Sequence, residues 1–181
     1  NRSTKKNTDG FSAFESFNYP HLCDAGVSFV FHEHHILQPD FSKPMAAHTA
    51  MNSNVVVFSL FPGIEENIVH HVLDAPELRS IVMRTYGSGN APKMPWIMQL
   101  LEKAAARGVT IVNISQCISG SVEMERYDTG YQLKQIGVVT GYDSTVEAAV
   151  TKMYLQAIYD DSATIRRLMN RSIAGEITVM A

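Results

Sequence analysis

The stretch Val55-Val56-Val57-Phe58-Ser59-Leu60-Phe61 is mostly apolar, rich in β-branched residues and closed by Pro62-Gly63. A short apolar run that ends in a turn signal is typical of a strand buried on both faces. Strands of this kind belong to parallel sheets that have helices on both sides. The run therefore predicts an α/β fold, and the segments that follow it test the prediction.

Helical and strand-like segments alternate after this run. Ser144-Thr145 provides an N-cap for one of the helices, and Gly108 a C-terminal stop for another. Strands that alternate with helices build βαβ units, so we expect a parallel sheet in a three-layer, flavodoxin-like α/β domain. The expected strands are 55–61, 80–85, 109–114 and 137–139, and the expected helices are 64–72, 95–107, 144–157 and 162–170.

Residues 38–54 differ in composition from the segments on either side. They contain two prolines and the polar triplet 52–54 without any periodicity, so we place a domain boundary there. Before it we expect a loop or helix over 9–17 and a strand over 26–36. The chain opens at Asn1 without an initiator methionine. We interpret this as a start in the middle of a protein, with a processed N-terminus as the alternative.

The composition argues against several classes of function. The 181 residues suffice for one domain, or for one domain and part of another. A net charge of -3 gives no basic field to attract nucleic acid or an anionic membrane. The longest apolar run is strand-sized and too short to cross a bilayer. Cys23 and Cys117 are far apart and form no CxxC pair, so we expect no disulfide framework and a cytoplasmic location.

The loop after the second expected strand reads Tyr86-Gly87-Ser88-Gly89-Asn90-Ala91-Pro92. In open parallel sheets, ligands bind beyond the carboxyl ends of the strands. The glycines allow a positive φ or a close approach to a ligand, and Asn90 can donate and accept hydrogen bonds. By these features alone, a structural turn and a ligand-binding loop are equally supported.

The loop after the third expected strand begins Ser115-Gln116-Cys117 and continues to Gly130. It is long and polar for a connection between a strand and a helix, which favours a functional role. Cys117 stands where a nucleophile could be presented, but no histidine lies near it in the sequence. We therefore expect a packed or ligand-lining thiol.

The histidines in His32-Glu33-His34-His35 do not predict a metal site. On the expected strand, His32 and His34 face one way while Glu33 and His35 face the other, so they do not converge on one ion. The HExxH zinc pattern is absent. We expect structural or surface histidines and no bound metal.

Three segments together resemble the bacterial type I (cytosolic) L-asparaginases. Their order and spacing fit this family across essentially the whole chain, whereas 32–54 matches poorly. The combination of YGxGNAP with QCxSG is specific, although each alone would be weak. The segments are Asn1-Arg2-Ser3-Thr4-Lys5 with 9–14, then 84–92, and then 113–120 with 127–130 and 143–149.

The resemblance implies an enzyme that hydrolyses L-asparagine to L-aspartate and ammonia without a cofactor. Such enzymes have a larger N-terminal and a smaller C-terminal α/β domain and form homodimers or homotetramers. Residues 1–37 would then end the N-terminal domain, 38–54 would be the linker and 55–181 the C-terminal domain. The family's threonine nucleophile lies in a TGGT-type motif, and a second threonine and an aspartate lie in a GTDT-type motif. Neither motif occurs here, so we expect the chain alone to be inactive.

The resemblance also assigns roles to individual residues. Lys5 matches the catalytic lysine, which would assist proton transfer from the threonine. Asn90 and Tyr127 match positions that the C-terminal domain contributes to the active site of a neighbouring subunit. The cooperative members bind regulatory asparagine, and Arg84 matches the residue that would hold its carboxylate. The expected effector pocket comprises Thr4, Arg84, Ser115 and Cys117.

Two other functions remain open on the sequence. The chain could be an amino-acid-binding regulatory module that senses asparagine without catalysis. It could also belong to an amidohydrolase of the same family that acts on glutamine or on a tRNA-linked amide.

Overall fold

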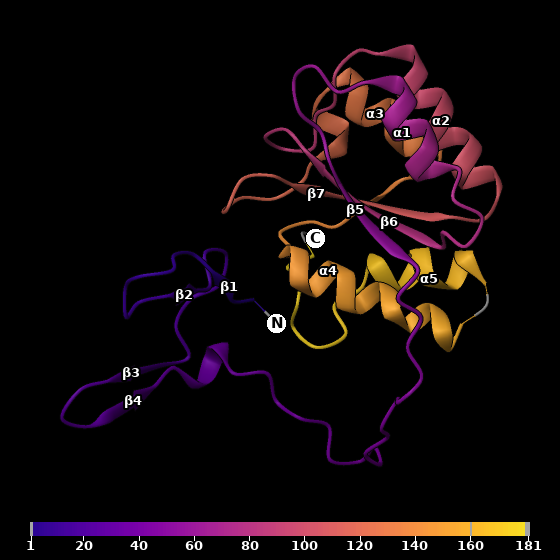
Figure 1. The fold of residues 1–181 in the computed structure, drawn as a ribbon. Helices are drawn as coiled ribbons and strands as arrows, with labels where there is room; N and C mark the ends of the chain where they lie inside the picture. Colours follow the sequence, from indigo (N-terminus) through magenta and orange to yellow (C-terminus); the bar gives the residue numbers. More distant parts are fainter. Residues whose placement is uncertain (1, 160, 180–181) are drawn as a thin grey trace.

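A four-stranded parallel sheet forms the centre of the molecule. The computed structural model describes residues 2–159 and 161–179. The strands β5 (Val55–Ser59), β6 (Ser80–Thr85), β7 (Thr110–Ser115) and β8 (Val139–Thr140) lie side by side in chain order. Figure 1 labels the first three of them. Val57, Val82, Val112 and Val139 lie opposite one another across the sheet. The predicted strands are confirmed, with ends that differ by at most two residues.

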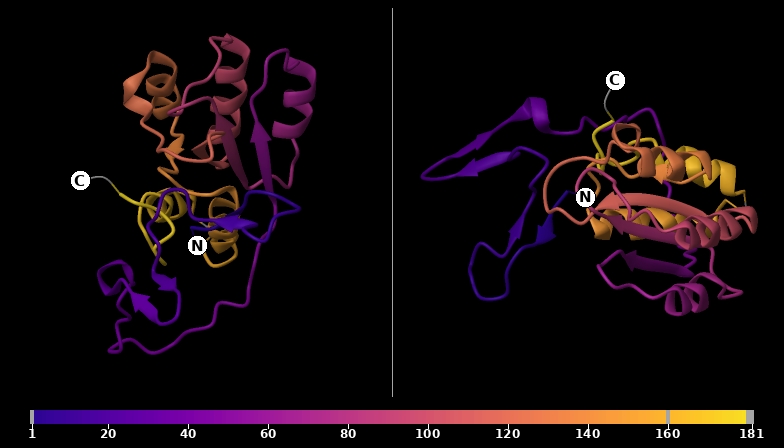
Figure 2. Two further views of the ribbon diagram at one scale, coloured as in Figure 1. Left: turned by 90° about the vertical axis from the view of Figure 1, so that its left-hand side faces the viewer. Right: turned by 90° about the horizontal axis from the view of Figure 1, so that it is seen from above.

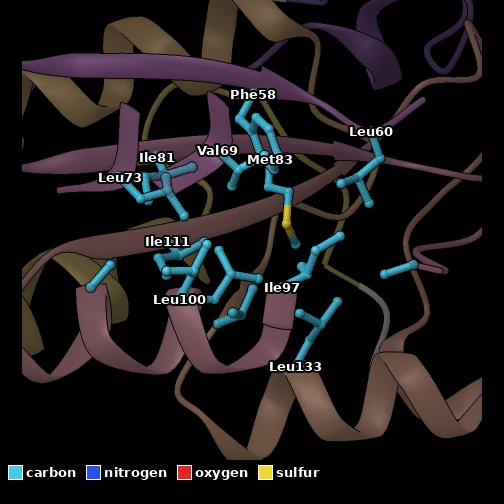
Figure 3. Packing of buried hydrophobic residues seen from close by; sticks show 14 of the residues in the cluster. Phe58, Leu60, Val69, Leu73, Ile81, Met83, Ile97, Leu100, Ile111 and Leu133 are labelled. Carbon is cyan, nitrogen blue, oxygen red and sulfur yellow. The ribbon is translucent and has the colours of Figure 1, made fainter. Parts of the chain in front are cut away.

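Helices cover both faces of the sheet, which confirms the three-layer α/β arrangement. Alternate residues of β6 pack in opposite directions: Ile81 and Met83 join one core cluster (Figure 3) and Val82 joins the other. Each cluster contains residues from the helices on its own side. α1 (Glu66–Leu73), α2 (Pro95–Ala106) and α3 (Asp128–Gln135) cover one face, and α4 (Val146–Met153) and α5 (Ser162–Met169) the other (Figure 1).

The capping signals of the sequence are used as expected. Thr145 is the N-cap of α4, and its hydroxyl oxygen accepts from the backbone amide of Ala148 at 3.1 Å. Gly108 follows α2 with a φ of 89°, a conformation that glycine adopts without strain. After α4 the chain continues as the 3₁₀ helix η3 (Tyr154–Ala157).

α3 occupies residues that the sequence analysis assigned to a loop. Gly130 lies within it, and glycine is unfavourable in helices. However, a Cβ at this position would collide with the backbone of Met124, in the 3₁₀ helix η2 (Met124–Arg126). Leu133 of α3 is fully buried in the core. Close packing therefore outweighs the local preference of the sequence.

The N-terminal part of the chain forms two hairpins that lie beside the α/β body (Figure 2). β1 (Thr4–Lys5) pairs with β2 (Phe14–Glu15), and β3 (Cys23–Ala25) pairs with β4 (Phe29–Phe31). The expected strand over 26–36 is confirmed only at Phe29–Phe31, and its extent is wrong. Gly26 and Ser28 close the turn between β3 and β4 with a backbone hydrogen bond of 3.1 Å. Asn1 lies outside the described residues.

This N-terminal part contains no core of its own. None of the described residues from 2 to 54 is buried. Phe11, Val27, Phe41 and Met45 are each more than nine-tenths exposed. An extended segment then leads into β5 (Figure 1). The ordered position of these hairpins therefore depends on polar contacts with the α/β body, which also build the candidate site.

Candidate functional site

A cavity of about 90 Å³ lies at the carboxyl ends of β6 and β7. All four residues of the expected effector pocket line it: Thr4 from β1, Arg84 from β6, Ser115 from β7 and Cys117 from the loop that follows. These residues come from segments far apart in the sequence, and the fold brings them together. The other lining residues are Asn18, Ile118, Gly120 and 142–146.

Arg84 supplies an unneutralised positive charge to this cavity. Its backbone is fixed, because its carbonyl accepts from the amide of Leu60 at 3.0 Å and from the Gln116 side chain at 2.9 Å. Its Nε is buried without a hydrogen-bond partner, and no carboxylate among the described residues pairs with the guanidinium. A buried donor without a partner is unfavourable, and a carboxylate is the group that a guanidinium fork binds best.

Ser115 ties together the two loops that border the cavity. Its hydroxyl donates to the carbonyl of Gly87 at 2.6 Å and accepts from the amide of Cys117 at 2.9 Å. Because the single donor of the hydroxyl is used, Ser115 can offer a ligand only a lone pair. The thiol of Cys117 is free and exposed.

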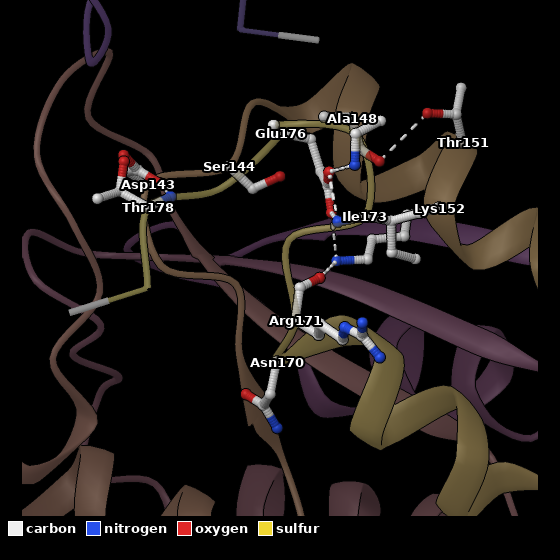
Figure 4. Close-up of polar contacts among 12 residues, drawn as sticks. Asp143, Ser144, Ala148, Thr151, Lys152, Asn170, Arg171, Ile173, Glu176 and Thr178 are labelled. Atoms are coloured by element: carbon white, nitrogen blue, oxygen red, sulfur yellow. Dashed lines mark hydrogen bonds and ion pairs between the residues drawn. The ribbon is translucent and has the colours of Figure 1, made fainter. Parts of the chain in front are cut away.

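Polar contacts hold the N-terminal hairpin against the cavity. Arg2 donates to the carboxylate of Asp143 at 2.7 Å, and the amide of Thr178 donates to the same carboxylate at 2.7 Å (Figure 4). Asn18 exchanges hydrogen bonds with the backbone of Gly120. These contacts join the first residues, the loop before α4 and the C-terminal segment beside the cavity.

Thr4 reaches α4 directly. Its hydroxyl donates to the carboxylate of Glu147 at 2.8 Å, in the first turn of that helix. Lys5, the next residue, is exposed and does not line the cavity. The side chain of Lys5 makes no hydrogen bond or ion pair with any described residue.

Asn90 and Tyr127 lie near the start of α3, away from the cavity. The loop around Asn90 is closed by backbone hydrogen bonds to Tyr86 at 2.8 and 2.9 Å. The side-chain oxygen of Asn90 accepts from the hydroxyl of Thr129, in the first turn of α3. Tyr127 immediately precedes α3 and is exposed, with the guanidinium of Arg126 6.0 Å from its ring centroid. The amide nitrogen of Asn90 and the phenol of Tyr127 therefore remain able to contact a ligand.

Gly89 gives this loop its shape. Its φ is 109°, and a Cβ there would lie 2.7 Å from a methyl group of Val122. Its carbonyl accepts from the side chain of Asn113 at 3.1 Å, and Asn113 in turn accepts from Thr85 at 2.6 Å. A buried amide in the middle of β7 thus fixes the glycine loop against the sheet.

The histidine cluster is arranged differently from the expectation. Glu33–His35 form the 3₁₀ helix η1, so the alternation assumed for a strand is wrong. The ring centroids of His34 and His35 are 3.8 Å apart, and His32 pairs with Asp24 at 3.0 Å. Within 2–159 and 161–179, no group of three histidine, cysteine or acidic residues could hold a metal ion. No helix in those ranges is long and apolar enough to span a membrane.

Comparison with known proteins identifies the family of this fold. Residues 54–169 match the family model described as the glutaminase/asparaginase C-terminal domain. The chain belongs to the glutaminase/asparaginase family. L-asparaginase 1 of Escherichia coli (strain K12) is 38% identical to this asparaginase-family chain over 185 residues, which cover 98% of the chain and 52% of that protein. The 60 kDa lysophospholipase of Mus musculus is 34% identical over 183 residues, which cover 100% of the chain and 32% of that protein.

Solved structures of asparaginases share the fold. The crystal structure of L-asparaginase I from Vibrio cholerae O1 biovar eltor str. N16961 has a TM-score of 0.89 at 34% identity, and the match covers 98% of this chain and 53% of that chain. This asparaginase-family chain thus spans about half the length of both asparaginases and corresponds to their C-terminal portion.

Sequence reasoning missed several residues that build the site of this asparaginase-family chain. Arg2, Asp143 and Glu147 stand in the segments that carry the resemblance, but no role was assigned to them. Their spacing gave no signal, because Arg2 and Asp143 are 141 residues apart. Asn113 offered the one available clue to a polar contact at the site, because its amide lies within a strand that is otherwise apolar except at its ends.

Proposed function

We propose that this chain is the C-terminal portion of an amidohydrolase that converts L-asparagine to L-aspartate and ammonia. Membership of the asparaginase family and the match of the whole chain to L-asparaginase 1 carry this proposal. The nucleophile is a threonine that lies outside these 181 residues. The free cysteines agree with a cytoplasmic protein.

Lys5 acts in the transfer of the threonine proton. A threonine hydroxyl is a poor nucleophile at neutral pH and needs a group that draws off its proton. The exposed, unpaired position of Lys5 in β1 leaves its ammonium group available to a carboxylate and a threonine from the preceding part of the enzyme. Residues 1–37 accordingly complete the N-terminal catalytic domain, 38–54 form the linker, and 55–181 form the C-terminal domain.

The active site is completed between subunits. Asn90 and Tyr127 project from the C-terminal domain toward the catalytic lysine of a neighbouring copy, in a homodimer or homotetramer. The side-chain oxygen of Asn90 is held by Thr129, which orients its amide nitrogen as a donor. A fixed donor of this kind suits the carboxylate of the substrate.

The cavity at the ends of β6 and β7 is the effector site. The observation that supports it is the unneutralised guanidinium of Arg84 in a cavity that Thr4, Ser115 and Cys117 also line. Arg84 binds the carboxylate of L-asparagine there. The cavity is separate from Asn90 and Tyr127, so effector and substrate do not compete for the same groups.

An ammonia-release assay tests the catalytic part of the proposal. The purified 181-residue chain should show no turnover of L-asparagine, because loss of the nucleophile from such a catalytic group lowers the rate by about a millionfold. Turnover by this chain would contradict a nucleophile outside it. The alternative of a pure asparagine sensor predicts binding and no turnover even when the preceding half of the protein is present. Assays of that longer protein with asparagine, glutamine and a tRNA-linked amide distinguish between these three possible substrates.

A further inference from the structure

Three histidine rings lie close together at η1, where the second hairpin leads into the linker. The ring centroids of His34 and His35 are 3.8 Å apart, and the centroid of His32 lies 6.2 Å from each of them. Imidazole rings gain a positive charge at mildly acidic pH, and like charges at such short distances repel each other. The arrangement is therefore most stable while these rings are neutral.

The surroundings of the cluster supply little negative charge to offset this repulsion. Asp24 of β3 lies 3.0 Å from Nε2 of His32, and it is shared with Nδ1 of His21 at 3.8 Å. Glu33, in the first turn of η1, is exposed and forms no ion pair with a described residue. No carboxylate within 2–159 and 161–179 forms an ion pair with either of the two closest rings. A proton on these rings thus has no counter-charge in contact with it.

The opposite side of the cluster is aromatic and positively charged. The ring of Tyr19 meets that of His35 edge to face at 6.2 Å, and the guanidinium of Arg2 lies 4.9 Å from the Tyr19 ring centroid. Partial burial, together with the rings of His34 and His32, holds the pKa of His35 below its ordinary value. A histidine with a lowered pKa binds its proton more readily once the structure around it opens.

η1 is attached to the α/β body through Tyr19. The Tyr19 hydroxyl donates to the carbonyl of His35 at 2.8 Å, and the preceding residue, Asn18, exchanges hydrogen bonds with Gly120. Tyr19 and His35 also line a cavity of about 520 Å³, to which residues beside both hairpins and Gly175 of the C-terminal segment contribute. A change in η1 therefore acts directly on the contact between the second hairpin and the body.

We propose that His32, His34 and His35 form a pH-sensitive latch, in which protonation at mildly acidic pH separates the rings, opens η1 and releases the second hairpin from Tyr19. The open form binds more protons than the closed form, so a falling pH favours opening and a rising pH favours closure. The latch does not depend on the proposed catalytic function or on the proposed effector site.

Amide hydrogen exchange of the complete chain, followed by NMR at pH 7.5 and pH 5.5, tests the latch. Protection factors, which remove the intrinsic pH dependence of exchange, are compared for the amides of His32, His35 and Ile36, since each of these amides donates a backbone hydrogen bond at η1 or at the end of the hairpin. His34→Gln removes one titrating ring from the cluster. His71→Gln is the matched control, because His71 is an exposed histidine of α1 outside the cluster.

We expect the protection of the three amides to fall by about tenfold or more at the lower pH, because the uptake of one proton on opening changes the open population by up to about tenfold per pH unit. Amides of β7 should show no such change. His34→Gln should abolish most of the fall and His71→Gln none of it. Equal protection at both pH values, or an equal fall in the two variants, would overturn the latch.

Tyr19→Phe tests the attachment of η1 separately. The variant keeps the ring and lacks the hydroxyl that donates to His35, so the amides of His35 and Ile36 should lose protection already at pH 7.5. Undiminished protection in this variant would contradict the release of the hairpin from Tyr19.

Discussion

Arg2 and Asp143 form an ion pair of 2.7 Å between groups that are each only 9% exposed, although 141 residues separate them in the chain. The same guanidinium donates to the carbonyl of Gly175 and to the hydroxyl of Thr178, both at 2.7 Å. One side chain thus joins the first hairpin to the loop before α4 and to the C-terminal segment. The proposed effector cavity lies directly beside this junction, because Asp143 lines it.

Removal of Arg2 should destabilise the fold. Arg2→Met leaves the carboxylate of Asp143 nearly buried without its cation, and we expect the free energy of unfolding to fall by roughly 2–4 kcal/mol. Denaturant unfolding measures this loss. Lys6→Met is the control, because Lys6 pairs with Glu15 at a more exposed position and should change stability by less than about 1 kcal/mol. Equal effects of the two substitutions would contradict the structural role of Arg2.

Acid should weaken the anchoring of the C-terminal segment. Burial raises the pKa of Glu176, but hydrogen bonds from Lys152 and from nearby backbone amides outweigh it and hold the pKa below its ordinary value (Figure 4). A carboxylate with a lowered pKa contributes stability above its unfolded pKa, and this contribution is lost as the pH falls through the folded pKa. Glu176→Gln should therefore lower stability at pH 7 and flatten its decline below about pH 4. A variant with an unchanged pH profile would refute this assignment.

Gly89 should tolerate no side chain. Gly89→Ala combines a positive φ with a Cβ 2.7 Å from Val122, so we expect a loss of about 2–4 kcal/mol in thermal or denaturant unfolding. Gly63→Ala has a similar φ of 83°, but a Cβ there meets nothing within 4 Å. It should cost only about 1 kcal/mol. Losses of the same size at both positions would show that Val122 does not restrict the loop.

Cys117 should report occupancy of the cavity. Its thiol is free, exposed and part of the cavity lining, so a thiol reagent should modify it at a rate that L-asparagine reduces. The measurement uses a Cys23→Ser background, which leaves a single cysteine. Succinate at the same concentration controls for ionic effects. A modification rate that asparagine does not change would argue against a ligand beside Cys117.

Local patterns in the sequence were sufficient to predict the sheet and four helices of the α/β domain. β-branched runs marked β5, β6 and β7, and the capping residues Thr145 and Gly108 marked helix ends. α3 escaped this reasoning because Gly130 and the polar residues around it disfavour a helix, and only tertiary packing against Met124 stabilises it. The hairpin turn at Gly26–Ser28 was also missed, because the residues around it favour an extended strand.

The candidate site was predictable only in part. The resemblance named Thr4, Arg84, Ser115 and Cys117 before any geometry was known, and these residues line one cavity. Glu147 could not be inferred in the same way. It contacts the cavity residue Thr4 through a hydrogen bond across 143 positions, and sequence periodicity carries no information on such a contact.

Calorimetric titration of L-asparagine into the unaltered chain and into Arg84→Gln measures most directly whether the cavity is an effector site. The guanidinium of Arg84, whose buried Nε has no hydrogen-bond partner, predicts specific binding by the unaltered chain and a loss of about tenfold or more in affinity for the variant. Binding of equal strength by both proteins, or no binding by the unaltered chain, would contradict the assignment of this cavity.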